Sequence, residues 1–190
     1  WQGRDFHIPV TGPLYGPQLK EEYPEVLEQA RLYPIELPVH DHRNFTHQER
    51  LLFTDPGIFQ IFTLQSLGSG LDHALDQPNS VVLSRSAAVQ YFGETDVIGK
   101  QLLVDFNDSK LALQVTGVFE DMPRQSHVRL DMLASMNTLP ALVGEDRLNT
   151  WLNNFLYTYL LLDSPASAAR LETGSKAFIE KYLAETFKPY

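Results

Sequence analysis

A group of histidines around one aspartate is the strongest candidate for a metal site: His40, Asp41, His42 and His47. Imidazole nitrogens and a carboxylate are ligands that zinc accepts. His40 and His42 stand at i, i+2 in a polar segment flanked by proline, and no His-Glu-x-x-His motif places two ligands on one helix face. A solvated loop is the favoured interpretation, and we expect no bound catalytic metal. A metal-dependent hydrolase built on His40, Asp41 and His42 stays open as an alternative.

Two glycine-containing stretches approach known motifs without matching them. Gly93 and Gly99-Lys100 are separated by five residues where a phosphate loop has four, and Gln101 stands where that loop needs Ser or Thr for magnesium. Lys100 is therefore expected to be an exposed residue at the start of a strand. Gly68-Ser69-Gly70 lacks the five-residue frame of a nucleophile elbow. No Ser/His/Asp set is predicted, and no cofactor is expected.

Three groups of acidic and amide side chains are candidates for acid–base or cation sites. Carboxylates do acid–base work when they are buried together, but these positions are expected on a solvated helix face, in a turn and in a loop without calcium-loop spacing. The groups are Glu21, Glu22, Glu25 and Glu28; Glu120 and Asp121; Asn107 and Asp108. Asn44 and Asn107 also match the glycan sequon, a pattern that is common by chance. The sequence therefore predicts no catalytic, cofactor-binding or metal-binding residue.

Composition bounds the function classes. The chain has 190 residues, with 15 basic and 24 acidic side chains and a net charge of 15 − 24 = −9, and 43% of its residues are hydrophobic. A packed core is expected, but nucleic acid and anionic lipid require a basic surface. The absence of cysteine excludes thiolate catalysis, disulfides and Cys-ligated zinc. No apolar stretch is long enough for a membrane helix. The chain begins at Trp1 without a signal peptide, and we interpret it as a soluble piece of something longer.

The first third of the chain predicts a helix and two strands. Residues 13–23 place tyrosines and a leucine on one helix face, and Pro24 ends that helix. Residues 26–37 are expected to form an irregular or edge strand, because they contain proline. Residues 44–53 are a weaker strand candidate. Asp55 is expected to cap a helix that begins at Pro56.

The rest of the chain predicts α+β organisation, because strands and helices interleave without a βαβα rhythm. Residues 80–83 form a short strand, and Ser84 caps a helix that ends at Gly93 with Ala88, Val89 and Phe92 inward. The expected hairpin pairs residues 102–106 with residues 111–119. Residues 128–134 alternate again, and residues 155–162 are expected to form a central strand. Ser164-Pro165 opens the last helix, which has Leu171, Phe178 and Tyr182 on one face.

An ordered series of motifs is more specific than any candidate site. The series consists of Gly12-Pro13-Leu14, Leu19-Lys20-Glu21-Glu22-Tyr23-Pro24, Asp55-Pro56-Gly57-Ile58-Phe59-Gln60-Ile61-Phe62, Pro78-Asn79-Ser80-Val81-Val82-Leu83-Ser84, Ala88, Tyr91-Phe92-Gly93, Asp96-Val97-Ile98-Gly99-Lys100, Val115-Thr116-Gly117-Val118-Phe119-Glu120-Asp121-Met122-Pro123 and Ser126-His127. Over about residues 11–185 it resembles the MacB-like periplasmic core domain of MacB/FtsX-type ABC transporter permeases, most closely those of Bacteroidetes.

The resemblance implies a periplasmic, non-catalytic domain of a bacterial inner-membrane permease. It implies two lobes: a porter-like α/β sandwich lobe, mapped to 1–53 plus 126–190, interrupted by a smaller inserted (Sabre-like) mixed α/β lobe, mapped to 54–125. We expect the lobes to be separate compact units, without one continuous sheet through 54–125 and 126–162, and to shift as near-rigid bodies. The alternative is one fused core, with Phe59 and Phe62 buried between the lobes and no relative motion.

The resemblance also implies how such a domain works. ATP-driven motion of cytoplasmic subunits is transmitted across the membrane to a substrate or a partner protein. The implied partners are a second permease copy, a cytoplasmic ATPase subunit and a periplasmic protein. Substrates in the family include antibiotics, peptides and lipoproteins. The implied outcome is transport, efflux or control of a cell-wall enzyme. The isolated piece is expected to be a monomer or weak dimer, with no nucleic acid. A stand-alone ligand-binding module with an acidic cleft is the alternative from another class.

Overall fold

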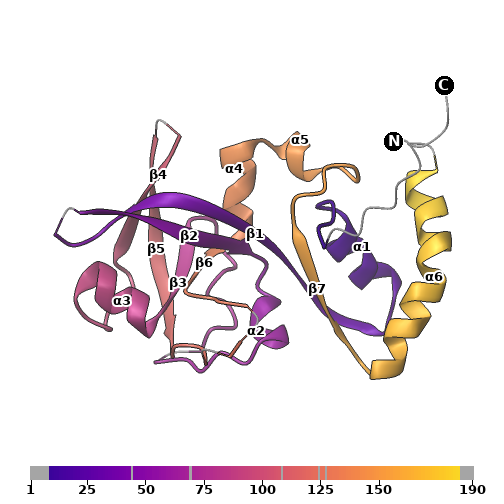
Figure 1. Ribbon diagram of the computed structural model, residues 1–190, viewed down its shortest axis with the longest axis horizontal. Coiled ribbons are helices and arrows are strands. Elements are labelled where there is room, and N and C mark those ends of the chain that lie inside the picture. Colours follow the sequence, from indigo (N-terminus) through magenta and orange to yellow (C-terminus); the bar gives the residue numbers. More distant parts are fainter. Residues whose placement is uncertain are drawn as a thin grey trace.

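The computed structural model describes residues 9–43, 45–68, 70–107, 109–123, 125–126 and 128–184. Strands and helices alternate irregularly, which confirms the expected mixed α+β class (Figure 1). In chain order the elements are α1 (Tyr15–Glu22), β1 (Val26–His40), β2 (Thr46–Thr54), α2 (Ile58–Ile61), β3 (Ser80–Ser84), α3 (Arg85–Phe92), β4 (Gln101–Phe106), β5 (Ser109–Phe119), β6 (Met132–Ser135), a 3-10 helix (Met136–Thr138), α4 (Leu139–Val143), α5 (Glu145–Leu148), β7 (Tyr157–Leu162) and α6 (Pro165–Leu183).

Strands β1 to β6 close into a small barrel. The sheet order is β2-β6-β3-β5-β4-β1-β7, and an additional β1–β2 pairing joins the first strand of this series to the sixth. The β1–β4 contact that completes the ring is short, with Val39 opposite Val104 and His40 opposite Leu103. β2–β6 and β3–β5 are parallel, and the other pairs are antiparallel. Closing a sheet in this way removes its open edges.

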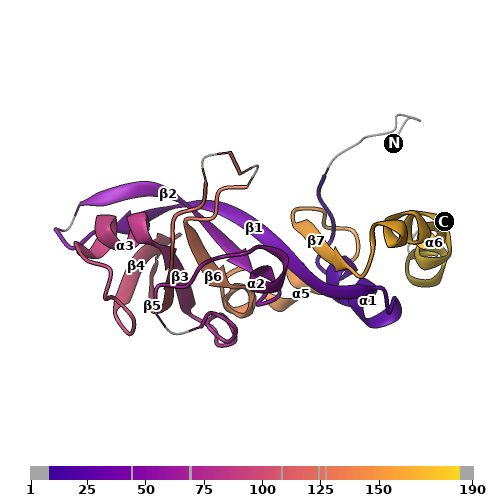
Figure 2. The same cartoon turned by 90° about the horizontal axis from the view of Figure 1, so that it is seen from below.

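β7 lies outside the barrel and shares strand β1 with it. Residues 26–32 of β1 pair with β7, whereas residues 32–40 pair with β2. Figures 1 and 2 show the result: β7, α1 and α6 lie at one end of the molecule and the remaining strands with α3 at the other, with β1 running through both. We call α1, residues 26–32, β7 and α6 the outer unit, and residues 33–40 of β1 with β2–β6, α3, and the segment with α2 that joins β2 to β3 the barrel unit.

Two prolines fit into β1 because the strand changes neighbours along its length. Between Tyr33 and Pro38 only β2 pairs with β1, since the β7 pairing ends at Leu32 and the β4 pairing begins at Val39. Pro34 and Pro38 fall in this stretch, where a missing N–H does not interrupt two ladders at once. The expectation of an edge strand is thus correct for the middle of β1 and wrong for its ends.

The barrel is filled by side chains that alternate along its strands. Leu51 and Phe53 of β2, Val81 and Leu83 of β3, and Met132 of β6 are buried in one core cluster. Their neighbours Leu52, Val82 and Leu133 belong to a second cluster on the outer face of the same strands. Period-two alternation places successive side chains on opposite faces. Because both faces of β3 are covered, its sequence is apolar without alternation, as expected for residues 80–83.

The expected separation of 54–125 from the rest of the chain is wrong. β3, β4 and β5, which belong to that segment, stand between β6 and β1 in one continuous sheet. The barrel core likewise combines Val81 and Leu113 with Leu51 and Met132. Closure needs β1, β2 and β6 as well, so the unit that contains the inserted segment starts within β1 and extends past residue 125.

Local predictions succeeded where the residues involved are neighbours in the chain. α1 and the β4–β5 hairpin form where expected, Ser84 accepts a hydrogen bond from the Ala87 N–H, and Gly93 ends α3 in the left-handed region (φ 79°). Val89 was expected inward but is 48% exposed, and Tyr91 is buried instead. β7 was expected to be central, yet it is the last strand of the sheet and its residues are all half-buried.

Candidate functional site

A charged clamp holds the two units together where α2 begins. Nε and Nη2 of Arg31 donate to the two carboxylate oxygens of Asp55 at 2.8 and 2.7 Å, and the Arg31 backbone N–H donates to Oδ2 at 2.9 Å. Gln29 Nε2 donates to the same oxygen at 3.2 Å. Arg31 also donates to the Pro13 carbonyl at 3.2 Å, which ties the segment before α1 into the clamp. A bidentate pair of this kind fixes orientation as well as distance.

The clamp explains the Asp55-Pro56-Gly57 motif better than helix capping does. α2 has Gly57 as its N-cap residue and no side-chain cap, so the expected capping role of Asp55 is wrong. A Cβ on Gly57 would lie 2.2 Å from the Gln29 carbonyl oxygen, because the chain passes directly against β1 here. Only glycine permits such an approach. Arg31 was missed from the sequence, since nothing near residue 31 indicates a partner 24 residues away.

Aromatic side chains after the clamp pack against the outer unit. The rings of Phe62 and Tyr159 of β7 meet edge to face with centroids 5.3 Å apart. Phe59 and Phe62 are half-buried and pack against the outer-face cluster, together with Tyr157 and Tyr159. This agrees with the alternative in which these phenylalanines lie between the two parts of the molecule.

The histidines at 40, 42 and 47 each have a separate partner. His40 Nε2 lies 2.9 Å from Asp105 Oδ1, and His42 Nδ1 lies 3.3 Å from the Tyr91 carbonyl oxygen. His47 Nε2 lies 3.3 Å from Asp41. Over the part of the chain that the structure describes, no three His, Asp or Glu side chains are grouped as a metal site requires.

Asp41 is a buried residue that organises the β1–β2 turn, rather than a solvated one. It accepts hydrogen bonds from the backbone N–H groups of Arg43 and Phe45, both at 2.9 Å, and from the Arg43 side chain. Burial alone would raise the pKa of the Asp41 carboxyl, but these donors and His47 outweigh it and hold that pKa well below its usual range.

The acidic groups singled out in the sequence are paired with cations or donors and not with one another. Glu22 binds Lys181 and the Tyr182 hydroxyl, and Glu28 binds Lys20. At the start of α3, Arg85 makes a bidentate pair with Glu120, and Ser86 donates to Asp121 from its N–H and its hydroxyl. Lys100 precedes β4, as expected, and pairs with Glu94. Among the residues named above, Asn44, Ser69, Asp108 and His127 lie outside the described residues.

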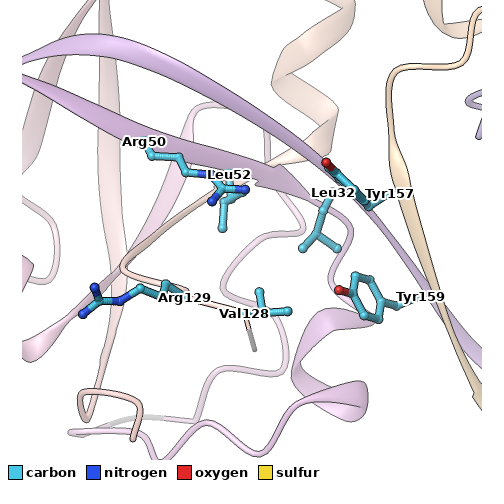
Figure 3. A pocket seen from close by; sticks show the side chains of 7 residues that line it. All are labelled: Leu32, Arg50, Leu52, Val128, Arg129, Tyr157 and Tyr159. Carbon is cyan, nitrogen blue, oxygen red and sulfur yellow. The ribbon is translucent and has the colours of Figure 1, made fainter. Parts of the chain in front are cut away.

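A pocket opens between the barrel unit and the outer unit. Its volume is about 270 Å³. Figure 3 shows two arginine side chains on one side of it, two tyrosine rings on the other, and aliphatic side chains between them. The lining residues are Leu32, Arg50, Leu52, Val128, Arg129, Tyr157 and Tyr159. No sequence pattern indicates this pocket, because its residues come from four separate segments.

Comparison with known proteins identifies relatives by sequence and by fold. The family model of the MacB-like periplasmic core domain matches residues 2–176. Similar solved structures include a domain of a permease protein from Porphyromonas gingivalis (TM-score 0.79, 24% identity, 94% of this chain and 74% of that one). The periplasmic region of MacB from Actinobacillus actinomycetemcomitans aligns with TM-score 0.64 and 16% identity over 93% of this chain and 77% of that one.

A third similar structure comes from Gram-positive bacteria. The extracellular domain of the noncanonic ABC-type transporter YknZ aligns with TM-score 0.60 and 15% identity over 90% of this chain and 87% of that one. A search of curated proteins finds no match. Within the described residues, no helix is both long enough and apolar enough to span a membrane.

Proposed function

Because this chain belongs to the family of MacB-like periplasmic core domains, we propose that it transmits ATP-driven conformational change in a MacB/FtsX-type ABC transporter to a substrate or partner protein. The chain is the periplasmic domain of a permease of this type. Its proposed role is mechanical and non-catalytic. Cytoplasmic ATPase subunits would supply the motion, and a second permease copy and a periplasmic protein are the further partners that we propose.

The observation that supports this role best is that one strand is shared by both units. β1 runs for 15 residues, pairing with β7 in the outer unit and with β2 and β4 in the barrel unit. A continuous strand couples the position of one unit to that of the other. Its middle, which includes Pro34 and Pro38, has only β2 as a neighbour and is the place where we expect bending.

The clamp and the aromatic contact limit which motions are available. Arg31 and Asp55 fix the start of α2 to the outer unit, and Phe62 rests on Tyr159. We propose that the barrel unit rocks relative to the outer unit and that these two contacts break and reform as it does. The two-lobe arrangement implied by the family resemblance then corresponds to the outer and barrel units, with a boundary inside β1. Few connections cross such a boundary in proteins that move by hinge bending.

Locking the two units tests the mechanical role. Phe62→Cys with Tyr159→Cys, joined by a short bis-maleimide, would link the units, and the 190 residues contain no natural cysteine that would interfere. The matched control joins Leu103→Cys to Ala112→Cys, which face each other across β4 and β5 inside the barrel unit. In the full-length permease reconstituted with its ATPase, we expect the first link to reduce ATP turnover several-fold and the second to leave it unchanged. Unchanged turnover with the units locked would count against the proposal.

The isolated domain is proposed to be a monomer. The two permease copies would be held together by membrane and cytoplasmic parts, and the net charge of −9 opposes association of this chain with itself. Light scattering at micromolar concentration should report the mass of one chain, 21.6 kDa. A stable dimer would show that the periplasmic domains contribute their own interface.

A further inference from the structure

We propose that the pocket between the barrel and outer units binds a small amphipathic monoanion, a carboxylate attached to a short aliphatic chain or ring. The proposal does not depend on the mechanical role. It rests on the distribution of charge and apolar surface in the pocket, on its volume, and on the two arginines beside it.

The apolar part of the pocket has two buried leucines at its base and three half-buried side chains around them. Leu32 of β1 and Leu52 of β2 are 3% and 2% exposed and belong to the outer-face cluster. Val128, Tyr157 and Tyr159 are half-buried around them. An alkyl chain or ring in this space would cover apolar surface that the protein leaves partly in water, and burial of such surface is favourable.

The charged part of the pocket comes from Arg50 and Arg129, which are both exposed. Among the described residues, neither guanidinium takes part in a hydrogen bond or an ion pair, although most other basic side chains of this acidic protein do. Glu36 stands opposite Arg50 across the β1–β2 ladder and still forms no ion pair with it. In Figure 3 both arginines lie on the side away from the tyrosine rings. A ligand would therefore place its anion at one end and its apolar group at the other.

Volume and total charge favour a small ligand with one charge. Ligand pockets usually measure about 300–1,000 Å³, and this one is slightly smaller at about 270 Å³. A large acidic protein surface would be repelled by the net charge of −9, whereas a single carboxylate experiences little of that repulsion once it lies beside two guanidinium groups.

A bound ligand would contact both units at once. Arg50 and Leu52 belong to β2 and Val128 and Arg129 to the segment before β6, whereas Tyr157 and Tyr159 belong to β7. A bound ligand would therefore stabilise the arrangement of the units seen here relative to one in which the pocket is wider or closed. The stabilisation equals the difference in the ligand's binding free energy between the two arrangements.

Titration calorimetry and ¹⁵N NMR on this chain test the proposal, with octanoate as the probe and octanamide as its uncharged counterpart. We expect octanoate to bind with a Kd on the order of 0.1–1 mM and to shift the amides of residues 50, 52, 129, 157 and 159. Arg50→Gln and Arg129→Gln should each weaken binding about tenfold, because each removes a charge-assisted hydrogen bond. Glu36→Gln should strengthen binding, because it removes a negative charge across the ladder from Arg50 that repels the carboxylate of the ligand.

Lys176→Gln is the matched control, since it removes one positive charge from an exposed position on α6. It should leave the octanoate affinity unchanged. Thermal unfolding would establish that each variant is folded, and Arg50→Lys, which keeps the charge, should retain most of the affinity if Arg50→Gln is unstable. The proposal is wrong if octanamide binds as tightly as octanoate, if Lys176→Gln weakens binding as much as the arginine variants, or if no binding occurs at about 10 mM.

Discussion

The barrel unit and the outer unit are stabilised in different ways. In the barrel, strands pair around a closed ring, and Phe53, Leu83 and Val104 are completely buried inside it. In the outer unit, β7 has β1 as its paired strand and its side chains stay half-buried. An aromatic group formed by Tyr15, Trp151 and Phe178 packs beneath α6, with ring centroids 5.1–6.2 Å apart.

This difference indicates which unit can change shape. A closed ring cannot open at one strand without losing pairing on both sides, so the barrel should move as one body. The outer unit depends on half-buried contacts and on exposed ion pairs such as Lys181–Glu22, which contribute little each. It is therefore the unit where rearrangement costs least, and the contacts between the units decide how far it goes.

Removing a buried aromatic ring should show the largest difference in stability between the two units. Phe53→Ala should lower the free energy of unfolding by about 4 kcal/mol, because it leaves a cavity inside the barrel. Phe178→Ala should instead act locally and raise hydrogen exchange in α1 and α6 while the barrel amides stay protected. Urea unfolding and hydrogen exchange measure both. Equal loss of protection throughout the chain in Phe178→Ala would show that the units are one cooperative body.

Breaking the clamp should have the next largest effect. Asp55→Asn removes the charge that the Arg31 guanidinium binds, and the partly buried guanidinium would be left uncompensated. We expect a loss of about 3 kcal/mol in the free energy of unfolding. Glu120→Gln is the control, because its pair with Arg85 is exposed, and it should cost much less than Asp55→Asn. An equal loss in the free energy of unfolding for the two variants would mean that the clamp stabilises the chain no more than an exposed ion pair does.

The acid sensitivity of the barrel unit should depend on Asp41. Because the pKa of Asp41 is lowered in the folded chain, the unfolded chain binds more protons around pH 2–4, and the stabilisation is present above the unfolded pKa of about 3.9 and lost as the pH falls. Asp41→Asn should therefore be less stable than the natural chain at pH 7, with the gap narrowing as the pH falls below the unfolded pKa. Thermal melts across this range measure it; a gap that stays constant with pH would contradict the assignment.

The sequence predicted the elements that depend on neighbours in the chain. Ser84 and Gly93 mark both ends of α3 through their own backbone and side-chain chemistry, and the alternation on either side of residue 107 predicts the β4–β5 hairpin. The ordered motifs predicted the family correctly.

What the sequence did not predict depends on partners that are distant in the chain. The barrel is closed by β1–β4 and parallel β2–β6 contacts, and no local pattern specifies either. β7 is expected at the centre of the sheet because both of its faces are apolar. In the structure one face meets the outer-face cluster and the other meets the layer with α1 and α6, and this explains why a strand at the end of the sheet is apolar on both faces. Arg31 and Asp55 were missed as a pair for the same reason.

Distance measurement between spin labels tests the central claim, that the two units move relative to each other when ATP is used. Val89→Cys on α3 and Ile179→Cys on α6 are 48% and 46% exposed and lie on different units. In the full-length permease, diluted with unlabelled copies so that only distances within one subunit contribute, we predict a shift of the distance distribution between the nucleotide-free and ATP-trapped states. A control pair inside the barrel unit, at Val89 and Leu103, should not shift. An unchanged Val89–Ile179 distance in both states would contradict the account.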